Sequence, residues 1–117
     1  MNQEVKKQWI AALRSGDYRQ GQNALRGFDN TYCCLGVLCE LAVQAKVIGP
    51  GSPCRFDDCY AYDGSSTYLP DPVIEWAGLD TRNPKVTIPD STSTTLAEAN
   101  DTMRSFEQVA DLIEAQL

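Results

Sequence analysis

The sequence contains no histidine, and this absence limits the chemistry that the chain can perform. Histidine is the commonest general base near neutral pH and the commonest metal ligand. A serine or cysteine hydrolase of the usual kind needs an imidazole to accept the proton of the nucleophile, so that mechanism is excluded. A lysine could serve instead only if burial lowered its pKa, and the lysines all lie in polar stretches. We therefore expect no triad.

Five cysteines are the next side chains that could react or bind metal: Cys33, Cys34, Cys39, Cys54 and Cys59. An odd number at wide spacing is unlike a secreted disulfide framework and favours a reducing compartment. Structural zinc sites prefer closely spaced cysteine pairs on turns. On a helix, Cys33 and Cys34 diverge by about 100°, and on one strand Cys54 and Cys59 point to opposite faces. We therefore expect buried, reduced thiols in the helix, two incidental cysteines, and no metal.

Carboxylates also occur side by side, at Asp57-Asp58. Such pairs can hold Mg²⁺ or cleave glycosidic bonds. Neighbouring residues of a strand point to opposite faces, so these two form a pair only if the segment is a turn. Asn100-Asp101 is explained by a turn where a helix stops. The glycine-containing segment 49–52 has no lysine after it and opens no helix, unlike a phosphate-binding loop. We expect no catalytic residue.

One segment has the composition of a recognition surface. Between residues 17 and 30, Tyr18, Arg19, Gln20 and Arg26 lie in a stretch without helical or strand periodicity. Tyrosine and arginine are enriched among residues that carry most of the binding energy at interfaces, and loops often carry function. The alternative, a solvated connector between two core helices, is slightly favoured. If the segment has a function, these four residues are the expected binding site.

Helices at the two ends of the chain are the clearest elements. Residues 3–15 carry an apolar stripe, with Asn2 as N-cap and Gly16 at the C-terminal end. The last helix starts at a capping box formed by Ser105 and Gln108, and apolar residues then follow on one stripe. Both patterns are typical of helices that pack one face against a core.

Residues 32–45 form the most apolar segment and predict a helix inside the core, because polar side chains are almost absent from it. Asn30 or Thr31 can cap its start. Gly36 costs helix stability relative to alanine, so we expect another backbone to approach closely at this position.

The second half of the chain predicts a hairpin and short elements. Residues 54–62 and 67–69 are expected to be strands around an Asp63-Gly64 turn. Asp71 is expected to cap a third helix, with Pro72 as its first residue. Two further elements complete the prediction: a strand at 85–88 and a helical turn at 96–99.

Length and composition predict one compact α+β domain over residues 1–117, with three to four helices and a small antiparallel hairpin or sheet. Sixteen acidic and ten basic residues give a net charge of −6, which disfavours nucleic-acid binding. No apolar run reaches the roughly 20 residues of a membrane span, and no secretory signal is visible. We expect a soluble protein of the cytoplasm.

Two runs of the sequence resemble a family of small uncharacterised proteins of bacteriophages, prophages and some bacteria. These runs are Trp9-x-x-Ala12-Leu13-x-Ser15-Gly16-x-Tyr18-x-Gln20-Gly21 and Tyr32-Cys33-Cys34-Leu35-Gly36-Val37-Leu38-Cys39-Glu40-Leu41. Later pieces around Trp76 and from Leu96 to Glu114 are similar to the same family, so the resemblance spans most of the chain. It implies a phage or prophage origin and no particular activity.

Three functions remain open. The first is a non-enzymatic accessory protein that binds a host protein, for instance in counter-defence. The second is a module for a small ligand, such as a nucleotide-like molecule or a metabolite, with a pocket between the hairpin, the third helix and the 18–26 loop. The third, ranked last, is an enzyme that uses carboxylates and arginines. No cofactor is expected.

Overall fold

A computed structural model describes residues 1–55, 58–102 and 104–117 of the chain. These ranges hold five helices: α1 (Gln3–Arg14), α2 (Cys34–Gln44), α3 (Asp71–Ala77), α4 (Leu96–Asp101) and α5 (Phe106–Gln116). They also hold seven strands: β1 (Arg19–Gln20), β2 (Arg26–Gly27), β3 (Thr31–Tyr32), β4 (Ser52–Pro53), β5 (Cys59–Ala61), β6 (Lys85–Thr87) and β7 (Ser93–Thr95). The expected α+β class is confirmed.

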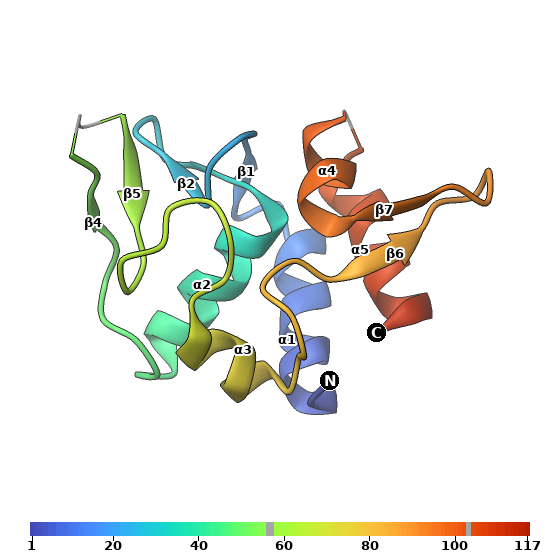
Figure 1. Cartoon of the computed structure of the whole chain (residues 1–117), viewed down its shortest axis with the longest axis horizontal. Coiled ribbons are helices and arrows are strands. Elements are labelled where there is room, and N and C mark those ends of the chain that lie inside the picture. Colours follow the sequence, from blue (N-terminus) through green and yellow to red (C-terminus); the bar gives the residue numbers. More distant parts are fainter. Residues whose placement is uncertain (56–57, 103) are drawn as a thin grey trace.

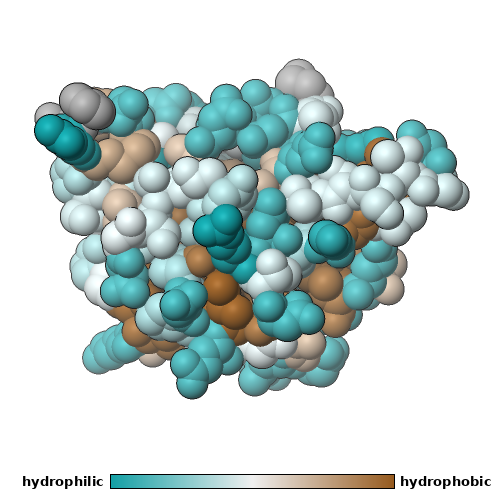
Figure 2. All heavy atoms as spheres, viewed as in Figure 1, coloured by the Kyte–Doolittle hydropathy of each residue, from teal (hydrophilic) through white to brown (hydrophobic). Residues whose placement is uncertain are grey.

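Five of the strands form one mixed sheet in the order β1-β3-β2-β5-β4, and β6 and β7 form a separate antiparallel hairpin. The β1–β3 pair is parallel, and the other pairs in the sheet are antiparallel. Figure 1 shows α2 between the sheet on one side and α1 and α5 on the other, while the β6–β7 hairpin projects from the far end. The face in Figure 2 is mostly hydrophilic, and hydrophobic residues show chiefly in its lower half.

Helix α2 is the centre of the core, as its composition predicts. Its residues from Cys34 to Cys39 are all buried. Trp9 of α1 is fully buried against its start, and the indole Nε1 donates a hydrogen bond of 2.9 Å to the carbonyl oxygen of Cys34. A buried tryptophan needs such a partner for its N–H group. This contact ties α1 to the N-terminal turn of α2.

Helices α1 and α5 pack side by side, so the two ends of the chain meet. The Arg14 guanidinium bridges two carboxylates of α5, at 2.6 Å from Asp111 and 3.2 Å from Glu114. Both carboxylates are more than 60% exposed and the Arg14 side chain is 31% exposed, so solvent screens this pairing and it adds little to stability. The buried stripes of the two helices supply the main attraction.

Gly36 allows a close backbone approach, which confirms the expectation. A Cβ atom at this position would overlap the carbonyl group of Leu25, a fully buried residue just before β2. The same carbonyl oxygen accepts a hydrogen bond of 3.2 Å from the Cys33 N–H group. The segment before β2 is therefore fixed on α2 by its backbone as well as by the Leu25 side chain.

The caps expected for the first and last helices are confirmed, whereas the cap expected for α2 is wrong. The Asn2 side chain accepts from two amides of α1, and Ser105 and Gln108 form the predicted capping box. Helix α2, however, begins after Cys33, which has no side-chain capping bond, rather than after Asn30 or Thr31. Thr31 instead belongs to β3, and Asn30, just before this strand, is a left-handed turn residue with a φ angle of 62°.

The second half of the chain departs from the prediction at several places. The single strand expected at 54–62 is wrong, since among its described residues only Cys59–Ala61 form a strand, β5, which pairs with Ser52–Pro53 of β4. The Asp63-Gly64 turn is confirmed, with φ angles of 49° and 83° between paired Tyr62 and Ser65. Residues 67–69 form no strand. Helix α3 takes Pro70 as its N-cap residue and begins at Asp71, so Asp71 is its first helical residue instead of its cap.

Substitution of Gly36 by alanine tests the close approach. We expect Gly36→Ala to lower the free energy of unfolding by about 1–3 kcal/mol, because overlap with the Leu25 carbonyl outweighs the gain in helix propensity. Gly49→Ala is the matched control, since nothing lies within 4 Å of a Cβ atom there. Thermal and denaturant unfolding of both variants measure the difference. Equal stability of the two variants would contradict the account.

Candidate functional site

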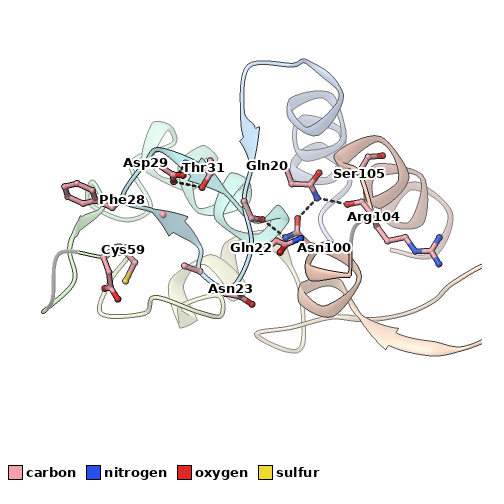
Figure 3. A pocket seen from close by; sticks show the side chains of 14 residues that line it. Gln20, Gln22, Asn23, Phe28, Asp29, Thr31, Cys59, Asn100, Arg104 and Ser105 are labelled. Carbon is pink, nitrogen blue, oxygen red and sulfur yellow. Dashed lines mark hydrogen bonds between the residues drawn. The ribbon is translucent and has the colours of Figure 1, made fainter.

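An open groove of about 940 Å³ lies over one face of the sheet. Its floor consists of small residues of the β1–β3 region: Gly21, Gly27 and Thr31. Figure 3 shows Asn100, Arg104 and Ser105, from α4 and the start of α5, along one side and Cys59 on the other. The groove therefore lies between two parts of the chain that are distant in sequence.

Glycine is required in the floor because Thr31 and Asp29 pack against it. A Cβ atom on Gly21 would overlap the Thr31 side chain, and one on Gly27 would lie 2.8 Å from Asp29 Oδ1. The hydroxyl of Thr31 donates to the same Asp29 oxygen at 2.7 Å. This hydrogen bond holds the pKa of Asp29 below its ordinary value. The groove thus contains an ionised carboxylate at neutral pH.

Asn100 supports the α4 side of the groove and is the one buried polar residue among those described. Its Oδ1 accepts hydrogen bonds from Gln20 Nε2 at 2.9 Å and from the Cys34 N–H group at 3.2 Å. Its Nδ2 donates to the Gly21 carbonyl at 2.8 Å and to Asp101 at 3.1 Å. Every polar position of this carboxamide is used, as a buried amide requires.

Gln20 extends this network to the last helix. Besides the bond to Asn100, its Nε2 donates to the Arg104 carbonyl at 2.6 Å. Its Oε1 accepts from the Phe106 N–H group, the first of α5, at 3.1 Å. Asn100 and Gln20 therefore supply distant caps for the free amides at the starts of α2 and α5. From the sequence, Asn100 is expected only in a turn where a helix stops. No local pattern indicates that its side chain caps the start of α2.

The opposite side of the sheet carries a row of aromatic side chains around one arginine. In the sheet, Arg26 lies opposite both Tyr32 and Tyr60. Its guanidinium carbon is 4.3 Å from the centre of the Tyr60 ring and 5.4 Å from that of Tyr32. Since side chains alternate along a strand, this row and the Gly27 and Thr31 floor lie on different faces.

Both ends of this row have further contacts. At one end, Tyr18 packs edge-on against Tyr32 with ring centres 5.3 Å apart, and its hydroxyl accepts from Gln44 of α2. At the other end, the Phe28 ring lies nearly parallel to Tyr60 at 6.4 Å. Phe28 is 60% exposed, and it is the only exposed large hydrophobic residue in the described ranges. Figure 3 shows its ring pointing away from the groove, at the rim.

The structure does not gather the four expected binding residues at one place. Tyr18 and Arg26 belong to the aromatic row, whereas Gln20 lies in the groove network. The Arg19 side chain is 72% exposed, and it reaches the backbone oxygen of Asp29 at 3.3 Å. Gln20 and Arg19 thus adjoin the groove, while the other two stabilise the reverse face. Residues of α4 and the α5 start, which complete the groove, were missed by the sequence analysis.

The expectation for Cys54 and Cys59 is wrong. The chain reverses between them, so they lie on paired strand ends with Cα atoms 5.3 Å apart and form a disulfide. Of the Asp57-Asp58 pair, Asp58 lines the groove, and Asp57 lies outside the described residues.

The other three cysteines are buried as predicted, although Cys33 precedes α2 instead of lying within it. Cys33, Cys34 and Cys39 are free and buried. Burial raises the pKa of Cys33 to about 11, and it also raises the pKa values of Cys34 and Cys39 above their ordinary range.

Together these features define a small α+β protein with a polar groove between its sheet and its C-terminal helices. Over residues 1–117 the sequence matches a family described as a domain of unknown function, DUF8296, and the chain belongs to this family. No curated protein and no solved structure matches it. Across the described parts of the chain, no helix is both long and apolar enough to cross a membrane.

Replacement of Asn100 tests the network. We expect Asn100→Ala to lower the free energy of unfolding by about 3 kcal/mol or more, because it leaves the Cys34 N–H group and the Gly21 carbonyl without partners. Asn83→Ala is the control, since within the described residues that half-buried side chain makes a single hydrogen bond, from the Ala97 N–H group. It should cost about 1 kcal/mol. If denaturant unfolding shows that both variants lose the same free energy of unfolding, the Asn100 network stabilises the fold no more than a single cap does.

The thiols give a second prediction. Since burial raises their pKa, Cys33, Cys34 and Cys39 carry little thiolate at pH 8, and thiolate is the reactive form. A disulfide reagent should therefore label the native, unreduced protein slowly and label three thiols rapidly once it is unfolded. Fast labelling of one native thiol would contradict the burial of these three cysteines.

Proposed function

We propose that this protein is a non-enzymatic binding protein, an accessory product of a phage or prophage that binds a host protein in the cytoplasm of the host. The observation that carries this proposal is the groove, whose walls are fixed before any partner arrives. Its α4 side is held by Asn100 and Gln20, and its floor by Thr31 over two glycines. A preformed surface loses little conformational entropy on binding.

The lining suggests a polar segment of the partner as occupant. Amides, hydroxyls and the charged groups of Asp29, Asp58 and Arg104 line the groove. Such groups can form directional hydrogen bonds to the backbone and polar side chains of a protein segment. Their mixed charge gives no concentrated field for a phosphate group, consistent with the overall acidic charge.

Phe28 supplies an apolar anchor beside the groove. Its ring is exposed but is held by the parallel Tyr60 ring, so little side-chain freedom is lost when a partner covers it. Aromatic anchors surrounded by polar contacts carry most of the energy in many protein interfaces. The partner is therefore expected to cover Phe28 and to enter the groove at the same time.

Capture of a partner from an extract of the host bacterium, followed by calorimetry with the purified partner, tests the proposal. We expect Phe28→Ala to weaken binding about thirtyfold, the size of an interface hot spot of about 2 kcal/mol. Arg104→Gln should weaken it less strongly. Its matched control is Arg82→Gln, an exposed arginine that stacks on Tyr68 outside the groove. If Phe28→Ala and Arg104→Gln bind as wild type does, the partner site lies elsewhere.

A small polar ligand is the second candidate, and the size of the groove favours it. About 940 Å³ lies at the upper end of the range for small-molecule sites. Mass spectrometry of metabolites released from the denatured protein distinguishes the two functions. A stoichiometric metabolite whose loss accompanies Arg104→Gln, together with no captured protein, would favour the ligand over the host protein.

A further inference from the structure

Three metal-ligating side chains meet at the β4–β5 hairpin, on the rim of the groove opposite α4. One sulfur from each of Cys54 and Cys59 and a carboxylate oxygen of Asp58 all lie within 4.8 Å of one another. Both cysteines are half-buried and Asp58 is exposed, so reductants and ions have access to them. Cys59 and Asp58 also line the groove.

We propose that the reduced hairpin is a zinc site, in which the Cys54 and Cys59 thiolates and the Asp58 carboxylate bind one Zn²⁺ ion. Two thiolates and a carboxylate are ligands that zinc prefers, and three protein ligands leave a fourth position for water. The disulfide and the ion need the same two sulfur atoms, so the two states exclude each other.

The backbone already holds the two cysteines at a suitable separation. The Cys54 N–H group donates to the Cys59 carbonyl at 2.8 Å, and the next pair along the strands is Pro53 opposite Tyr60. Two thiolates on a tetrahedral zinc ion, each at about 2.3 Å from it, lie about 3.8 Å apart. Rotation about the Cα–Cβ bonds supplies this separation without breaking the backbone pairing, because the Cα atoms are only 5.3 Å apart.

Conversion between the two states is a balanced two-electron exchange. A dithiol reductant attacks one sulfur, the Cys54–Cys59 bond breaks, and the dithiol closes to its own disulfide while its two protons pass to the cysteines. Zn²⁺ then displaces both thiol protons, since it binds thiolate. Cys33, just before α2, and Cys34 and Cys39 within it do not compete, because they are buried and separate from this cluster.

Cobalt(II) is the probe for the test, because its thiolate charge-transfer absorption reports bound sulfur directly. We expect protein reduced with a phosphine to bind one Co²⁺ per chain with this absorption, and Zn²⁺ to displace it. The same protein without reduction should bind none. A reduced wild type without the absorption, or an equal signal from the unreduced protein, overturns the proposal without use of any variant.

Variants then assign the ligands. Cys54→Ser and Cys59→Ser should each abolish the thiolate absorption of the two-sulfur site, and Asp58→Asn should weaken zinc binding roughly tenfold or more. Asp63→Asn, at an exposed aspartate of the adjoining turn, is the matched control and should bind as wild type. Retention of wild-type affinity by Asp58→Asn or by Cys59→Ser contradicts the assignment. None of these readouts requires the binding partner, so they are independent of the proposed function.

Discussion

The carboxamide of Asn100 joins segments that are far apart in the chain. Its partners Gln20 and Gly21 lie 80 and 79 positions away, and Cys34 lies 66 positions away. A buried amide without partners costs about 1–3 kcal/mol for each missing bond, so the four bonds must form together. This requirement fixes β1 and the start of α2 against α4, and through Gln20 it also fixes the start of α5.

The groove follows from this constraint. The sheet places small residues on one face, because Arg26 and Tyr32 direct their side chains to the other face and stabilise it there. Helix α4 cannot cover the small-residue face, since Asn100 holds it at the edge of the sheet. An open groove remains between α4 and the hairpin that carries Cys59 and Asp58. One rim is therefore fixed by buried hydrogen bonds and the other by a bond that depends on redox conditions.

Sequence reasoning succeeded where the signal is local. Helices α1 and α5 have apolar stripes and side-chain caps within four residues, and Gly36 in an otherwise good helix correctly indicated a close backbone. The strands between residues 17 and 32 are only two residues long, and tertiary pairing rather than propensity produces them. The reversal between Cys54 and Cys59 and the distant capping by Asn100 depend on contacts that no local pattern records. For the resemblance to a phage family, what is shown is membership of the family DUF8296.

Native-state hydrogen exchange at two amides tests most directly whether the network is the common support of the fold. The Cys34 N–H group is bonded to Asn100, and the Phe106 N–H group is bonded to Gln20. If the network opens only when the whole protein unfolds, both amides exchange with the free energy of global unfolding, as does Val37 inside α2. If the Cys34 and Phe106 amides exchange with a much smaller opening free energy than the Val37 amide, the account is contradicted. The groove wall would then open independently of the core.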